Sequence, residues 1–169
     1  MPKPSPLTYA PYFKRYVELV PENDLIPAFR NQTAGIQEFL SNITEEKSAY
    51  AYAEGKWSIK ELLQHVIDTE RIFNYRALCF ARGEKTNLPG FEENDYAANS
   101  LANSRTWLSL IDEFLAVRKS SELMFESFNE VVINNAGLSN NNPNTVASLG
   151  FITVGHYYHH KKILLERYL

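Results

Sequence analysis

The sequence contains very little cysteine, a modest number of basic residues and no long apolar run. Cys79 is the single cysteine in 169 residues, which excludes an internal disulfide framework and suits a reducing cytoplasm. The chain has 17 lysines and arginines against 20 acidic residues, so its net charge of −3 gives no basic footprint for nucleic acid. No apolar segment is long enough to span a bilayer, and residues 1–6 lack the apolar part of a targeting signal. We therefore expect a cytoplasmic protein that binds neither nucleic acid nor membrane.

Length and composition indicate one globular domain over residues 1–169. The chain is 44% hydrophobic and 13% aromatic, which is enough to form a core without disulfides. The first twenty residues hold four prolines among several aromatic side chains. We expect segment 1–20 to be partly irregular and to pack on the rest of the domain.

Apolar residues recur at helical spacing in four long segments, and no run alternates as a strand would. The connections 83–99 and 134–144 carry the glycine, proline and asparagine residues that interrupt helices. We expect the first connection to return the chain along the bundle or to cover a pocket, and the second to be a flexible loop. The pattern predicts an all-α fold, an antiparallel four-helix bundle. Its helices are expected over residues 24–41, 58–82, 101–128 and 145–169.

The clearest helix start lies at Ser58. Glu61 follows three residues later, so the two side chains can form a capping box, and Trp57 can pack on the first turns. Gly83 provides a natural stop at the other end. The helix between them contains His65, the one histidine that lies far from the C-terminus.

The other three histidines lie together in the stretch Gly155 to His160. On a helix, His156 and His160 stand one turn apart, about 40° around the axis, so both imidazoles can face one object. His159 stands about 100° from His160 and turns aside. A metal ion held by protein needs at least three ligands, and His65 is the remaining histidine that a fold could bring alongside. The spacing thus indicates a metal site formed by His65, His156 and His160.

A purely structural interpretation of these histidines is also open. A lone histidine on a partly apolar helix face is often a hydrogen-bonded core residue, and a pair at i and i+4 occurs by chance. From spacing and amphipathicity alone, both interpretations stand.

Seven segments of the chain match the pattern of a known family: 56–65, 68–73, 75–77, 81–83, 88–91, 155–160 and 166–169. On these segments the chain resembles the DinB superfamily, whose members are four-helix bundles with a divalent metal held by three histidines. The resemblance covers nearly the whole chain, although the first and third helices match only in pattern. By this resemblance, the first ligand of the family corresponds to His65, and the later pair corresponds to His156 and His160.

The resemblance implies an open metal site on a protein that acts on small molecules. Three neutral imidazoles leave the full charge on a bound Zn²⁺ or Ni²⁺ and leave positions free for water or substrate. Such an ion can lower the pKa of a water or a thiol toward neutrality. Some relatives resemble S-transferases that use a low-molecular-weight thiol, and others resemble hydrolases. By analogy with the family, we also expect a homodimer.

Two hypotheses of different classes follow from this. The first is a metal-dependent thiol S-transferase or hydrolase; the second is a metal-binding bundle with a structural, sensory or stress-related role and no turnover. The sequence identifies no second catalytic group. Glu61 and Asp68 could orient an imidazole, but we expect capping or solvation of each. We expect structural ion pairs from the charged residues Glu70, Arg71, Arg76 and Arg167.

Overall fold

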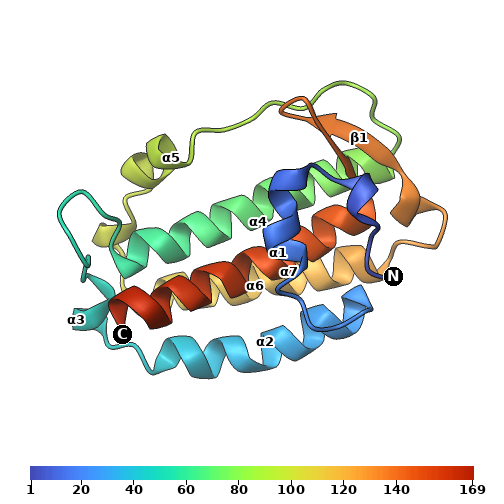
Figure 1. The fold of residues 1–169 in the computed structure, drawn as a ribbon. Coiled ribbons are helices and arrows are strands. Elements are labelled where there is room, and N and C mark those ends of the chain that lie inside the picture. Colours follow the sequence, from blue (N-terminus) through green and yellow to red (C-terminus); the bar gives the residue numbers. More distant parts are fainter.

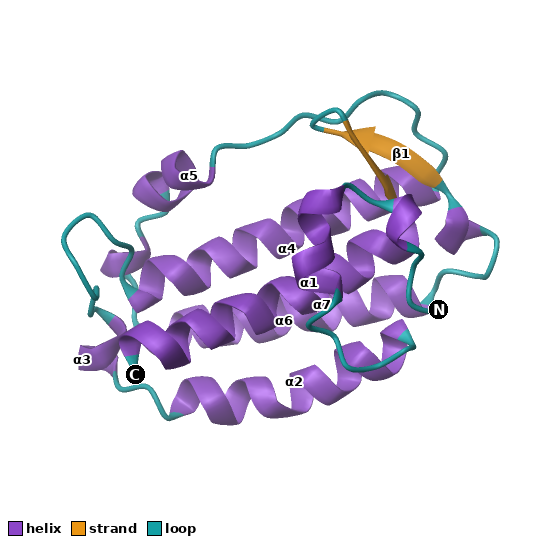
Figure 2. Ribbon diagram, in the orientation of Figure 1, coloured by secondary structure: helices purple, strands orange, loops and turns teal.

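Four long helices form the body of the protein in the computed structural model, which describes all 169 residues (Figures 1 and 2). Helix α4 packs against α6 and α7, and α2 packs against the same two helices from the other side. The predicted four-helix bundle is therefore confirmed. None of its helices combines the length and the apolar character that crossing a bilayer requires. The bounds are Leu25–Ser41 for α2, Ile59–Ala81 for α4, Trp107–Glu126 for α6 and Val146–Ile163 for α7.

Two helices run in each direction along the bundle. The Trp107 indole at the start of α6 donates to the carbonyl of Leu40 at the end of α2. At the same end of the bundle, the Tyr168 hydroxyl beyond α7 donates to the carbonyl of Trp57 just before α4. Helices α4 and α6 therefore run parallel to each other and antiparallel to α2 and α7, as Figure 1 shows. The connection after α4 returns the chain along the bundle, which is one of the two roles predicted for it.

Side-chain caps set the starts of these helices. Ser58 and Glu61 form the predicted capping box at α4, and Thr145 and Ser148 form a second one at α7. Asp24 accepts a hydrogen bond from the first turn of α2, so the predicted start of that helix is also correct. Each cap satisfies backbone N–H groups that the helix itself leaves without partners.

Helix α6 begins later than predicted. Leu101 has a left-handed backbone (φ 54°) and a 72% exposed side chain, so it cannot belong to a buried helical stripe. Residues Ala102–Ser104 form a short 3₁₀ turn, and the Thr106 side chain then caps α6 by accepting from the N–H of Ser109. The apolar periodicity of the sequence continues through this turn. The predicted start of the helix, residue 101, is therefore six residues too early.

The connection predicted as the loop 83–99 contains the short helix α5, Glu93–Asn99. Gly83 ends the preceding helical stretch with φ 85°, as expected of a glycine in this place. The segment between them lies over the bundle and contributes Gly90 and Phe91 to a cavity described below.

The connection predicted as the flexible loop 134–144 is in fact a β-hairpin. Strands β1 (Ala136–Ser139) and β2 (Asn142–Thr145) pair antiparallel with Ser139 opposite Asn142. The two residues between them, Asn140 and Asn141, have φ values of 49° and 61°. Two consecutive left-handed residues match the tight turn that favours hairpins, and asparagine tolerates this conformation well.

The N-terminal segment combines irregular backbone with short helical turns. Two 3₁₀ turns precede α1, Lys14–Val17, whose Tyr16 and Val17 are buried against the bundle. Figure 1 shows α1 lying across the bundle beside α7. At the other end, a short helix α3, Glu45–Ser48, follows α2, and a π-helical segment, Leu164–Tyr168, extends α7.

Gly155 allows this close approach of α1 to α7. A Cβ atom at this position would lie 2.0 Å from the backbone carbonyl oxygen of Tyr16. We expect Gly155→Ala to destabilise the protein by roughly 1–3 kcal/mol, because backbone must move to accommodate the methyl group. Gly35 in α2 is a matched control with nothing within 4 Å of its added Cβ, so Gly35→Ala should stabilise by roughly 0.5–1 kcal/mol. Urea unfolding measures the change in the free energy of unfolding for each variant. Changes of the same sign in the two variants would contradict the close packing of α1 at Gly155.

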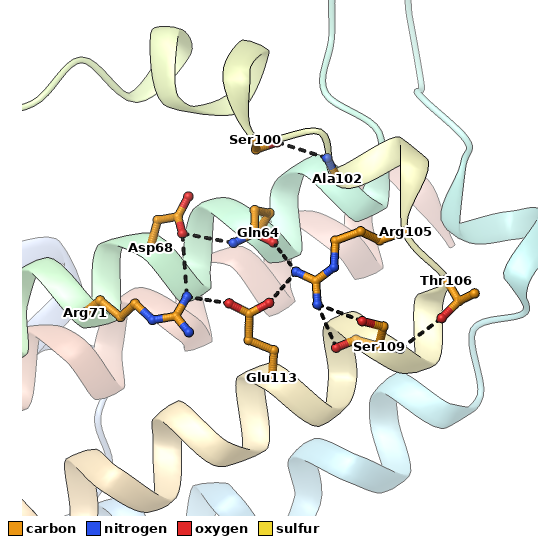
Figure 3. A network of polar contacts seen from close by, with 9 residues as sticks. All are labelled: Gln64, Asp68, Arg71, Ser100, Ala102, Arg105, Thr106, Ser109 and Glu113. Carbon is orange, nitrogen blue, oxygen red and sulfur yellow. Dashed lines mark hydrogen bonds and ion pairs between the residues drawn. The ribbon is translucent and has the colours of Figure 1, made fainter.

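A polar network joins α4 to α6 on the side away from α7 (Figure 3). The Gln64 amide donates to Asp68 and accepts from Arg105, and Glu113 pairs with both Arg105 and Arg71. Burial raises the pKa of the Glu113 carboxyl group. The hydrogen bonds from the two guanidinium groups outweigh this effect and hold the pKa below its usual value. The network fixes the long helix that carries His65.

The four charged residues predicted to form ion pairs behave in different ways. Glu70 pairs with the fully buried Arg118 at 2.8 Å, and Arg71 pairs with Glu113. Arg167 has no acidic partner and donates to the Tyr52 hydroxyl. Arg76 also lacks an acidic partner, so the ion-pair prediction is correct for two of the four residues.

Candidate metal centre

The structure brings His65 of α4 together with His156 and His160 of α7. The Nε2 atoms of His65 and His156 lie 3.3 Å apart, and those of His156 and His160 lie 3.0 Å apart. The three side chains offer ligand atoms that all lie within 4.8 Å of one another, and all three residues are buried. Tertiary packing of two antiparallel helices thus assembles the set that the sequence indicated.

Local structure explains why the three rings meet. The capping box fixes the start of α4 and so the angular position of His65, while one helical turn aligns His156 with His160. Aromatic rings enclose the set. Trp57 packs on His65 with ring centroids 4.9 Å apart, and Tyr16 meets His156 edge to face at 5.4 Å.

Burial keeps these imidazoles neutral. Desolvation, with a smaller contribution from nearby His159, lowers the pKa of His65 to about 4. Burial and the neighbouring histidines lower the pKa values of His156 and His160 well below the usual value. Neutral imidazole is the form that ligates a metal, and burial favours this form in all three residues at neutral pH.

The donor set fits a single divalent ion. Nitrogen ligands at about 2.0–2.1 Å from a tetrahedral metal stand roughly 3.3 Å from one another. The Nε2 separations of 3.3 Å and 3.0 Å are of this size. Three ligands leave at least one coordination position to water or substrate, as in catalytic rather than structural sites.

The metal-free protein should lose stability as the pH falls through the range between the pKa values of His65 in the unfolded and folded states. The pKa of this imidazole is near its ordinary 6.5 when unfolded and about 4 when folded, so the unfolded state gains the proton first. The contribution of the neutral His65 imidazole to the free energy of unfolding is therefore fully present above pH 6.5. It is lost as the pH falls toward 4. Between pH 7 and 4.5 it amounts to about 2–3 kcal/mol for this residue alone.

Urea unfolding of the metal-free wild type and of His65→Gln at both pH values measures this contribution. The glutamine cannot titrate, so the variant should show a correspondingly smaller loss. Equal pH dependence of the two proteins would contradict the assignment of a depressed pKa to His65.

His159 and the nearby carboxylates stand apart from the set. His159 is half-buried and packs on Tyr16 at 5.2 Å between ring centroids, outside the group of converging ligand atoms. Glu61 accepts from the backbone of Ser58, and Asp68 accepts from Gln64. No carboxylate therefore orients an imidazole, and the Nδ1 atom of His160 has no hydrogen-bond partner at all.

A cavity of about 400 Å³ opens onto two of the three histidines, His65 and His156. Its volume is within the usual range for small-molecule sites. The sequence indicated the histidines but not most of the other residues that line the cavity. The N-terminal aromatics were predicted only to pack, and the asparagine-rich segment was predicted to be a loop. The cavity is also lined by Tyr12, Phe13, Tyr16, Thr69, Phe73, Arg76, Phe91, Glu93 and residues of the hairpin turn.

A second cavity of about 300 Å³ reaches the third histidine, His160. It shares no lining residue with the first and is built from the segment before α4 and the end of the chain. Lys56 and Arg167 give it a basic character, and Trp57 forms part of its wall. The histidine set thus lies between two separate cavities.

Comparisons with known proteins agree with this fold. YfiT from Bacillus subtilis, described as a probable metal-dependent hydrolase with an unusual four-helix bundle topology, has a TM-score of 0.72 and 11% identity over 96% of this chain and 95% of that one. A mycothiol-dependent maleylpyruvate isomerase has a TM-score of 0.63 and 14% identity over 88% of this chain but 59% of its own. At these identities the likeness concerns the fold alone. No curated protein sequence matches the chain significantly.

A sequence model of the DinB superfamily matches residues 28–164. The match runs from the first turns of α2 through α7 and includes all three converging histidines. It covers far more than half of the 169 residues. The protein therefore belongs to the DinB superfamily.

Proposed function

We propose that this protein is a metal-dependent enzyme that activates a thiol or a water molecule for S-transfer or hydrolysis on a small molecule. His65, His156 and His160 would hold a divalent ion, with Zn²⁺ or Ni²⁺ the best match to an all-imidazole set. The observation that carries the proposal is the convergence of three buried Nε2 atoms beside a cavity of about 400 Å³.

The charge of the ligand set supports a catalytic role. Held by three neutral imidazoles, a divalent ion would keep its full charge and would serve as a Lewis acid that lowers the pKa of a thiol or water toward neutrality. The protein supplies the neutral ligands by burying them. Trp57, Tyr16 and Phe73 surround the imidazoles with aromatic surface, which limits bulk water and strengthens electrostatic interactions there.

The two cavities favour a reaction with two substrates. S-transfer joins a thiol to an electrophile, and each cavity could admit one of them to a different side of the histidine set. The relatives are consistent with both branches of the proposal, since one is described as a probable metal-dependent hydrolase and the other as mycothiol-dependent.

The competing hypothesis is a metal-binding bundle without turnover, whose role is structural, sensory or stress-related. In the structural case the metal would hold the bundle together. The hydrophobic core argues for a fold that survives without metal, because clusters of 21 and 16 buried residues pack the helices along their length. We expect the far-ultraviolet circular dichroism of the protein to be unchanged after chelation. Collapse of the helical signal would instead assign the metal a structural role.

A screen of metal-loaded protein tests the reaction. Cellular thiols are paired with reactive electrophiles in one arm, and simple esters and amides are supplied in the other. Turnover should require His65 and should survive His159→Ala, because only the first belongs to the converging set. Turnover by His65→Ala at the wild-type rate would contradict the proposal.

A further inference from the structure

Arg76 is a buried cation without an acidic partner. Its side chain is only 6% exposed, and its one hydrogen bond runs from Nη2 to the carbonyl of Pro89 at 2.8 Å. No carboxylate lies within ion-pairing distance, whereas the other buried arginine, Arg118, pairs with Glu70. Guanidinium groups stay charged in proteins, and a buried charge is costly unless it is paired. The donors of Arg76 are therefore free for an anion that comes from outside the chain.

The guanidinium group lines the same cavity as the histidine set. Arg76 follows His65 by eleven positions on α4, which places its Cα about 16 Å further along the helix axis. Side chains of a helix tilt toward its N-terminus, so the guanidinium group leans back toward the histidines. One cavity thus has a metal-binding end and a cationic end.

The stretch between these ends is aromatic. Phe73 lies 6.0 Å from His156 and 6.1 Å from Phe13 between ring centroids. At the cationic end, the hairpin adds the polar side chains of Asn140 and Asn142 to the lining. A ligand that fills the cavity would need an apolar middle and a polar, negatively charged end.

We propose that Arg76 binds the carboxylate of an amphipathic substrate whose reactive group lies at the histidine set and whose apolar middle lies along Phe73. This inference rests on the proposed function and names its substrate class. A carboxylate matches the site better than a phosphate dianion, because one guanidinium group supplies one positive charge and a planar pair of donors.

Glu93 is the acidic residue that also lines the cavity, and it is exposed. It forms no ion pair with Arg76, and its side chain does not compensate the buried guanidinium charge. Glu93→Gln is therefore a suitable control, since it changes the charge of the lining without removing the anion-binding donors.

The test compares ω-mercaptooctanoate with ω-mercaptooctanamide on Co²⁺-loaded protein. These probes differ in charge at the end remote from the thiol. Calorimetry gives both affinities, and the cobalt–thiolate absorption band reports separately whether the thiol reaches the metal. Wild type and Glu93→Gln should bind the carboxylate about 10- to 100-fold more tightly than the amide. Arg76→Gln should bring this ratio close to one while leaving the amide affinity unchanged, and Arg76→Lys should retain part of the preference.

Equal affinity of wild-type protein for the two probes would overturn the inference without any variant. A loss of affinity for both probes in Arg76→Gln would also overturn the inference. This result is expected if the hydrogen bond from Arg76 to Pro89 serves only to hold the structure. Absence of the cobalt–thiolate band in wild type would count against thiol activation, and the calorimetric ratio would still decide the role of Arg76.

Discussion

Replacing His65 by alanine is expected to abolish stoichiometric binding of a divalent metal. The three Nε2 atoms converge from two helices, and removal of His65 leaves the two ligands of α7 alone. Protein sites for Zn²⁺ keep at least three protein ligands. Even a residue that merely orients a ligand contributes about 10- to 100-fold to metal affinity, so loss of a ligand should exceed that range. Elemental analysis of purified protein should give close to one ion per chain for wild type and close to none for the variant.

The other histidines supply matched controls for this result. His156→Ala and His160→Ala should lose the metal as His65→Ala does. His159→Ala should keep it, since this ring packs on Tyr16 and lies outside the converging group. Stoichiometric metal in the His65 variant, or its loss from the His159 variant alone, would contradict the assignment.

Replacing Glu70 by alanine is expected to destabilise the protein by roughly 3–5 kcal/mol. Glu70 is 2% exposed and pairs with Arg118 of α6, whose side chain is fully buried. Gln32 accepts another bond from this guanidinium group, and Ser121 donates to the carboxylate. Without Glu70, the charge of Arg118 would remain buried and uncompensated. Chemical denaturation measures the loss of stability.

An exposed pair provides the control for this second prediction. Glu18 pairs with Lys14 at the surface, so Glu18→Ala should change stability by no more than about 1 kcal/mol. Replacing Glu70 and Arg118 together by methionine should recover much of the loss, because both charges then leave the core. A Glu70→Ala variant as stable as Glu18→Ala would show that the buried charge is compensated in another way.

The helical framework could be predicted from the sequence because its signals are local. The capping residues Asp24 and Ser58 mark the starts of α2 and α4, and apolar periodicity marks their buried faces. The spacing of His156 and His160 followed from the geometry of one helix. The convergence of His65 with them required α4 and α7 to be neighbours, which the family resemblance indicated and the structure shows.

Other features depend on tertiary packing and could not be predicted in this way. The hairpin turn at Asn140 was hidden in a stretch whose many asparagines also suit a loop. The late start of α6 depends on Thr106, a cap that an unbroken apolar pattern concealed. Arg76 was expected to pair with an acid, and only the folded protein shows that it lines a cavity without one. Asn140 and Arg76 line the cavity that opens onto His65 and His156.

Anomalous diffraction from crystals of the metal-loaded protein, recorded at the absorption edge of the metal, locates the bound ion relative to the histidines. We predict one peak per chain at about 2.0–2.1 Å from the Nε2 atoms of His65, His156 and His160. His159 should lie outside bonding distance of that peak. A peak bound by fewer than three of these nitrogen atoms, or located elsewhere in the bundle, would contradict the three-histidine metal centre.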